Sequence, residues 1–120
     1  MTGKPTVLIT GASSGIGATY AHRFARRGHN LVLVARDEAR MQALASDLRK
    51  EAGVEIDILP ADLTKLEDLA VAEARLRDDH NIGVLINNAG AALSGGFIER
   101  STDEIAQLVA LNTTAVVRLA

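Results

Sequence analysis

The sequence predicts an α/β fold of three layers, in which a doubly wound parallel sheet lies between two layers of helices. Apolar runs alternate four times with amphipathic segments along the 120 residues, and no linker, repeat or low-complexity stretch interrupts them. Most of these runs are continuously apolar, as in strands that are buried on both faces of a parallel sheet. With right-handed crossovers, we expect the strand order 3-2-1-4.

The first strand and helix are expected in residues 6–28. The run 6–10 is apolar and β-branched, as a buried strand requires. Ile16, Tyr20 and Phe24 then recur at helical spacing, and Gly28 follows as a C-terminal cap. This spacing places Tyr20 on the inner face of the helix, as a core residue.

The second strand is expected at residues 31–34, and its helix begins near Asp37 and ends at Gly53. We expect the inner stripe of that helix to consist of Met41, Leu44 and Leu48.

The third strand, residues 55–60, alternates polar and apolar residues and is expected nearer an edge of the sheet. Thr64 and Glu67 match a reciprocal capping box, which predicts a helix start at Thr64. The inner face of this helix is expected to carry Leu66, Leu69 and Leu76.

The fourth strand is expected at residues 84–86, followed by Asn87-Asn88-Ala89-Gly90. A second capping box, Ser101 with Glu104, predicts a last helix whose apolar stripe continues to the end of the sequence.

Composition excludes several functional classes. The net charge is −2 and aromatic residues make up 2%, which argues against a nucleic-acid-binding surface. The sequence has no cysteine, and its three histidines are too far apart to suggest a metal site. No apolar run approaches the length of a membrane span, so we expect a soluble, cytoplasmic protein with no membrane partner.

The stretch Thr10–Gly17 places three glycines between the first strand and its helix. Glycine allows positive φ and a close approach of ligand to backbone, and the N-terminus of the helix favours an anion such as pyrophosphate. The alternative is a glycine-containing turn that binds nothing. The functional interpretation predicts cofactor contacts from Gly11, Ser13, Ser14, Gly15, Ile16 and Gly17.

Other candidate residues follow the second, third and fourth strands, so all of them are expected at one edge of the sheet, where the strands' carboxyl ends meet. After the second strand, Arg36 suits the 2′-phosphate of NADP, which is therefore favoured over NAD. The alternative is that Asp37 and Glu38 only supply negative charge to the next helix, with Arg36 solvated beside them.

Asp62 is expected to accept a hydrogen bond from the adenine amine, with the Leu63 backbone completing the contact; the alternative is a plain turn carboxylate. Asn88, Ala89 and Gly90 are expected beneath the ribose, although a strand-ending turn uses similar residues. Asn112 interrupts an apolar stripe, so it holds either a catalytic water or a structural hydrogen bond.

These motifs together resemble the short-chain dehydrogenase/reductase family, whose Rossmann-type fold binds NAD or NADP. The resemblance covers the whole chain and rests on Thr10, Gly11, Gly15, Ile16 and Gly17, on Asp62-Leu63, on Asn87 to Gly90, and on Asn112. NADP-preferring members commonly have arginine where Arg36 stands. Some also have a basic residue before the second glycine, where this chain has Ser14.

The resemblance implies hydride transfer between NADP and a carbonyl or secondary alcohol. It makes Asn112 the holder of a proton-relay water, and it implies a homodimer or homotetramer that pairs through the helix starting at Ser101; the same stripe could instead face its own sheet. The family's tyrosine acid/base and lysine have no match here, since Tyr20 is followed four positions later by Phe24.

Residues 1–120 are therefore expected to form the amino-terminal part of one dinucleotide-binding domain, with the catalytic tyrosine and lysine beyond Ala120. Two alternatives are a dinucleotide-binding or sensing module without turnover, and a purely structural domain.

Overall fold

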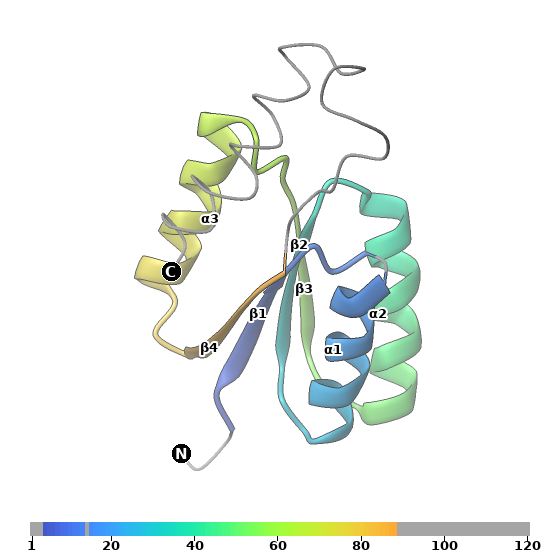
Figure 1. Cartoon of the computed structure of the whole chain (residues 1–120). Helices are drawn as coiled ribbons and strands as arrows, with labels where there is room; N and C mark the ends of the chain where they lie inside the picture. Colours follow the sequence, from blue (N-terminus) through green and yellow to red (C-terminus); the bar gives the residue numbers. More distant parts are fainter. Residues whose placement is uncertain (1–3, 14, 89–120) are drawn as a thin grey trace.

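The computed structural model describes residues 4–13 and 15–88. In this part of the chain, strands and helices alternate (Figure 1) in the order β1 (Thr6–Thr10), α1 (Gly15–Arg26), β2 (Leu31–Ala35), α2 (Glu38–Ala52), β3 (Ile56–Pro60), α3 (Leu66–Asp78) and β4 (Ile82–Asn87). Among the described residues, no helix combines the length and apolar character that crossing a bilayer demands.

The four strands form one parallel sheet in the order β3-β2-β1-β4, which confirms the predicted topology. Ile9 of β1 pairs with Leu33 on one side and with Ile86 on the other. The carboxyl ends of the strands therefore lie at the same edge of the sheet, which we call the carboxyl edge.

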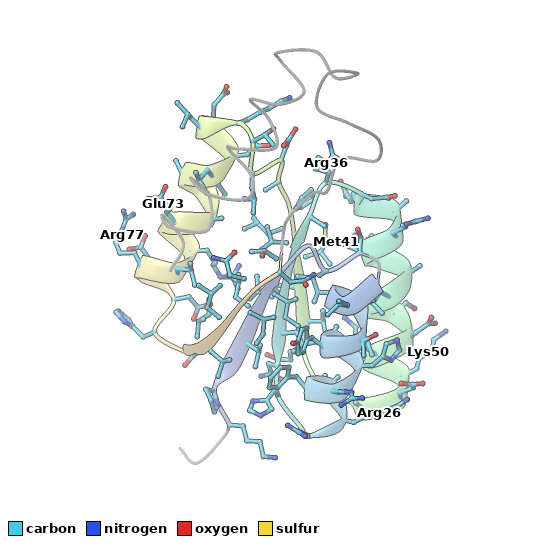
Figure 2. All side chains as sticks on the ribbon, in the orientation of Figure 1. Arg26, Arg36, Met41, Lys50, Glu73 and Arg77 are labelled. Atoms are coloured by element: carbon cyan, nitrogen blue, oxygen red, sulfur yellow. The ribbon has the colours of Figure 1, made fainter. Side chains whose placement is uncertain are left out.

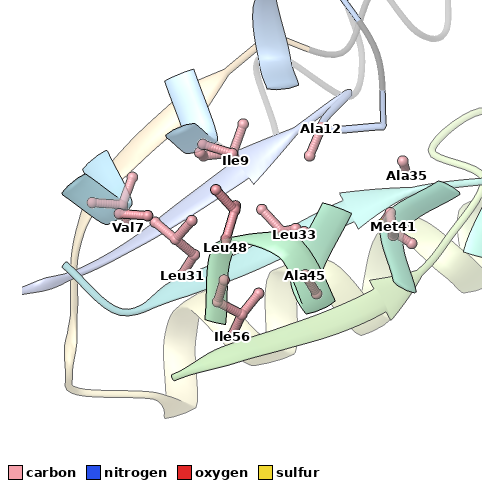
Figure 3. Close-up of a cluster of buried hydrophobic side chains, with 12 residues drawn as sticks. Val7, Ile9, Ala12, Leu31, Leu33, Ala35, Met41, Ala45, Leu48 and Ile56 are labelled. Atoms are coloured by element: carbon pink, nitrogen blue, oxygen red, sulfur yellow. The ribbon is translucent and has the colours of Figure 1, made fainter. Parts of the chain in front are cut away.

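Each strand sends alternate side chains into two separate apolar layers, because successive residues of a strand point to opposite faces. Helices α1 and α2 cover one face of the sheet, and α3 covers the other (Figure 1). The first layer (Figure 3) includes Val7, Ile9, Leu31 and Leu33 from the sheet, with Ala21, Ala25, Met41 and Leu48 from the helices. The second includes Leu8, Val32 and Val34, with Leu69 and Ala72 of α3.

Helix α1 buries small residues, whereas Ile16 and Tyr20 are exposed and Phe24 is only partly buried against the first apolar layer. Its buried positions are Gly17, Ala21 and Ala25. The prediction that Tyr20 is a core residue is wrong, because its side chain is 39% exposed and stacks on Phe24, with ring centroids 6.5 Å apart. A glycine and two alanines let the helix approach the sheet closely, which turns the Ile16–Tyr20 side outward.

Helix α2 begins and ends as predicted. Asp37 is its N-cap, and Gly53 is its C-cap with a φ of 67° in the left-handed region that favours glycine. Met41 and Leu48 are fully buried, and Leu44 packs against the same apolar layer.

The predicted capping box at the start of α3 is wrong. Lys65 is the N-cap and makes no side-chain capping bond. The Thr64 hydroxyl donates instead to Asp62, 2.6 Å away. Leu66 is 68% exposed rather than on the inner face, where Leu69 is buried. Local pairing of Thr64 with Asp62 has displaced the helix start by one residue.

Candidate functional site

Hydrogen bonds tie the loops at the carboxyl edge to one another. The Ala12 N–H donates to the Val34 carbonyl oxygen at 3.4 Å, which joins the loop after β1 to β2. The Ala61 N–H donates to the Ala35 carbonyl at 2.9 Å, which joins the end of β3 to the end of β2. Residues that are far apart in sequence therefore meet at this edge, as predicted.

The end of β4 is tied to the glycine loop by Asn88. Its side-chain Nδ2 donates to the Gly11 carbonyl oxygen at 3.4 Å. A Cβ at residue 17 would lie 2.1 Å from the same oxygen and 2.8 Å from Asn88 Nδ2. Glycine at position 17 is therefore required by the close packing of α1 against both loops.

Thr10 and Asn87 make a second tie between β1 and β4. The Thr10 side chain is fully buried, and its Oγ1 lies 3.3 Å from Asn87 Oδ1 and 3.5 Å from the Ile86 carbonyl oxygen. The hydroxyl has one proton to donate, and both acceptors lie on β4. This pair fixes the strand ends from which the glycine loop and Asn88 emerge.

Gly11 and Gly15 adopt positive φ, at 64° and 58°. A Cβ at Gly15 would meet nothing within 4 Å, so the backbone there faces open space. Glycine at position 15 thus allows the left-handed turn and leaves the loop accessible to a ligand. This is the geometry that a phosphate cradle requires.

The N-terminus of α1 differs in charge from those of α2 and α3. Helix α1 has no acidic residue in its first turn, whereas α2 has Glu38 and α3 has Glu67 and Asp68. Acidic groups compensate the positive end of a helix dipole. Among the three helices that the structure describes, α1 is the one whose first turn leaves this charge for an external anion.

Arg36 is exposed and follows β2 directly (Figure 2). Its neighbour Asp37 caps α2, since its Oδ1 accepts a hydrogen bond from the Arg40 N–H at 3.0 Å. Asp37 therefore lies at the start of the helix, as both interpretations of this stretch allow, and the role of Arg36 stays a prediction. Capping by Asp37 leaves the Arg36 side chain available at the carboxyl edge.

Asp62 is held in place by its own loop. Its Oδ1 accepts from the Thr64 N–H at 3.0 Å and from the Thr64 hydroxyl at 2.6 Å. Its backbone N–H donates to Asp68 Oδ2 at 2.8 Å. The capping-box pattern pairs Thr64 with Glu67 and does not single out Asp68; the Asp-x-Thr spacing, which is typical of an Asx-turn, could have indicated that Thr64 bonds Asp62.

Ionised Asp62 is favoured by its surroundings. Partial burial is the largest effect and by itself raises the pKa of the carboxyl group. The two Thr64 hydrogen bonds and the positive charges of Arg36 and Lys65 together outweigh it, so the pKa of Asp62 is lowered. Arg36, which follows the adjacent strand, thus contributes to lowering the pKa of Asp62.

The predicted site residues differ in what they can offer a ligand. Ile16 is 67% exposed, so its side chain can be covered by a bound molecule. Leu63 is 5% exposed and packs in the apolar layer beneath α3, which leaves its backbone for contacts. The predictions for Ser14, Ala89, Gly90 and Asn112, and for the helix starting at Ser101, lie outside the described residues.

A separate cavity of about 620 Å³ lies at the opposite edge, around Lys4, Asn30 and Gly83. Its arginine, Arg75, is paired with Asp57 at 2.7 Å and with Asp79 at 2.9 Å, so its charge is already compensated. Within residues 4–13 and 15–88, no three histidine or carboxylate side chains gather as a metal ion would require.

The family model described as "short chain dehydrogenase" matches residues 5–120. The bulky-bulky ketone specific alcohol dehydrogenase from Comamonas testosteroni superposes with a TM-score of 0.97 at 64% identity, over 99% of this chain and 48% of its own. A short-chain dehydrogenase from Sphingobium yanoikuyae in complex with NADPH superposes with a TM-score of 0.93 at 65% identity, over 96% and 45%.

A curated human relative, inactive hydroxysteroid dehydrogenase-like protein 1, is 31% identical over 110 residues. The match covers 90% of this chain and 33% of that protein. The chain thus spans about half the length of the two solved relatives and a third of the curated one. The matched family model and the parallel sheet of order β3-β2-β1-β4 agree, and the chain belongs to the short-chain dehydrogenase family.

Proposed function

We propose that the full-length protein is an NADP-dependent oxidoreductase that transfers a hydride between the nicotinamide and a carbonyl or secondary-alcohol substrate. Residues 4–88 supply the part of the site that holds the adenosine and pyrophosphate. The observation that carries the proposal is the open glycine loop at the one described helix whose first turn lacks an acidic residue.

The residues at the carboxyl edge fit such a cofactor. The N-terminus of α1 and the backbone of Gly15 offer N–H groups and positive potential to the pyrophosphate. Bound NADPH supplies the hydride; the residues described here bind and orient it. Asn88, whose side chain donates to the Gly11 carbonyl oxygen, is assigned to the ribose, as are Ala89 and Gly90.

Asp62 and Leu63 are assigned to the adenine. Asp62 Oδ1 is engaged by Thr64, so Oδ2 is the oxygen assigned to the exocyclic amine. The buried side chain of Leu63 limits its contribution to backbone contacts. Asn112 is assigned to the proton-relay water.

Arg36 is assigned to the 2′-phosphate, which favours NADP over NAD. A guanidinium donates paired hydrogen bonds to phosphate oxygens. The NADPH complex of the Sphingobium yanoikuyae relative supports this choice.

The substrate is proposed to be a ketone or the corresponding alcohol. The name of the Comamonas testosteroni relative, specific for bulky-bulky ketones, supports a ketone with two large substituents. The catalytic tyrosine and lysine are expected downstream of the residues described here.

A dinucleotide-binding module without turnover is the second candidate, favoured by the human relative that is named inactive. Both candidates place the same cofactor at the carboxyl edge, so binding alone does not separate them.

Consumption of NADPH distinguishes the oxidoreductase from the module without turnover. The full-length protein is incubated with NADPH and a ketone bearing two bulky substituents, and NADPH consumption is followed by absorbance. An oxidoreductase consumes NADPH only when ketone is present. NADPH binding without consumption over a panel of ketones and alcohols would favour the module, and no binding of NADPH or NADH would exclude both.

A further inference from the structure

Asp37 poses an electrostatic problem for the proposed cofactor site. It follows Arg36 directly, so its Cα lies about 3.8 Å from that of the residue assigned to the 2′-phosphate. A phosphate group carries up to two negative charges, which a nearby free carboxylate would repel.

The Asp37 carboxylate lies at the N-terminus of α2, and each of its two oxygens has a partner on Arg40. Oδ1 accepts the Arg40 backbone N–H at 3.0 Å. Oδ2 lies 3.6 Å from Arg40 Nε. One residue thus engages Asp37 through its main chain and through its guanidinium.

These two contacts differ in what they do. The backbone bond caps the helix and would persist with almost any residue at position 40. The guanidinium adds a positive charge that offsets Asp37. The Arg40 side chain is 64% exposed, so solvent weakens the electrostatic effect that it has on Asp37 and on a ligand at Arg36.

We propose that Arg40 is a specificity-determining residue that acts through Asp37: by neutralising this carboxylate, it lets Arg36 accept a 2′-phosphorylated dinucleotide. The inference rests on the proposed function and assigns to Arg40 no direct contact with the cofactor. It predicts a selective effect, because NADH lacks the 2′-phosphate that Asp37 would repel.

The test is a double-mutant cycle in the full-length protein, with dissociation constants for NADPH and NADH measured by calorimetry. Arg40→Gln is expected to weaken NADPH binding about three- to five-fold, the range of an exposed ion pair, and to change NADH binding less than about two-fold. Arg40→Lys, which keeps the charge, is expected to restore most of the NADPH affinity.

The second arm repeats the substitution in an Asp37→Asn background, in which asparagine keeps the helix cap without the charge. There Arg40→Gln is expected to change NADPH binding less than about two-fold, since no carboxylate is left to neutralise. An equal loss in both backgrounds would overturn the route through Asp37. An equal loss for NADPH and NADH would overturn the specificity role.

The NADPH and NADH affinities of Arg36→Asp, measured in the same experiment, distinguish a failure of this inference from a failure of the proposed function. If the wild type prefers NADPH and loses that preference with Arg36→Asp, but Arg40→Gln leaves the ratio of NADPH to NADH affinity unchanged, only the role of Arg40 fails. If the wild type shows no preference for NADPH, the cofactor assignment itself fails.

Discussion

The side-chain amide of Asn88 donates to the carbonyl oxygen of Gly11 at 3.4 Å, across 77 positions of sequence. This bond joins the end of β4 to the glycine loop after β1, at the place where α1 packs through Gly17.

Gly17→Ala is expected to destabilise the fold strongly. Its Cβ would lie 2.1 Å from the Gly11 carbonyl oxygen, a backbone atom that cannot move without shifting the loop. We expect a loss of about 3 kcal/mol in the free energy of unfolding, measured by urea denaturation.

Gly15→Ala is the matched control in the same loop. Its Cβ meets nothing within 4 Å, so the cost is that of a φ of 58°, about 1 kcal/mol. This variant is expected to lose cofactor affinity more than stability. Equal destabilisation by the two alanines would contradict the packing argument.

Asn88→Asp is expected to weaken the tie between β4 and the glycine loop. A carboxylate in place of the amide cannot donate to the Gly11 carbonyl, and two acceptors would then face each other at about 3.4 Å. We expect a loss of about 1 to 3 kcal/mol in unfolding free energy. Asn88→Ala, which removes the donor without adding charge, should cost less.

Because Asn88 does not face the 2′-phosphate in this account, NADPH and NADH affinities should fall together in Asn88→Asp. A selective loss of NADPH binding would show that Asn88 has a role that the proposed site does not include.

Thr64→Val is expected to raise the pKa of Asp62 toward its ordinary value of 3.8. The variant removes the hydroxyl that donates to Oδ1 but keeps the shape of the side chain. The titration of the Asp62 carboxyl carbon, followed by NMR, measures the change. An unchanged pKa would mean that the hydroxyl does not stabilise the carboxylate.

The same substitution predicts a pH dependence of stability. A carboxyl group whose pKa is lowered in the folded state stabilises it above the unfolded pKa, and this contribution disappears as pH falls through the folded pKa. Wild type should therefore exceed Thr64→Val in stability most at neutral pH, with the difference shrinking below pH 3.8. A difference that is constant with pH would assign the effect to packing alone.

Arg36→Asp is expected to reverse the cofactor preference. NADPH binding should weaken by about 1 to 3 kcal/mol, through loss of a charge-assisted contact and new repulsion. NADH binding should hold or improve, because aspartate can accept a hydrogen bond from a ribose 2′-hydroxyl. Calorimetric titration of wild type and variant with both cofactors measures these changes. Equal NADPH affinities of wild type and Arg36→Asp would show that Arg36 does not contact the 2′-phosphate.

Long-range organisation was predictable from the sequence because it follows from repeated, local patterns. Continuous apolar runs such as 31–34 predicted buried parallel strands joined by right-handed crossovers, and the doubly wound order 3-2-1-4 was the one expected. The same reasoning placed Arg36 and Asp62 at one edge, where the positive charge of Arg36 contributes to lowering the pKa of Asp62.

Details of helix packing were not predictable in this way. The inner face of α1 is set by the approach of Gly17 to Gly11, which a count of apolar residues cannot detect, so Tyr20 was placed in the core. At α3, Thr64 bonds Asp62 rather than capping the helix. The first depends on a contact between distant segments and the second on a local hydrogen bond, and hydrophobic periodicity detects neither.

Hydrogen–deuterium exchange of the full-length protein, with and without NADPH, tests most directly whether the carboxyl edge is one dinucleotide site. If it is, NADPH slows exchange together in the peptides containing Gly15, Arg36, Asp62 and Asn88, while exchange at the opposite edge around Arg75 is unchanged. Protection confined to one of these loops, or centred on the opposite edge, would contradict it.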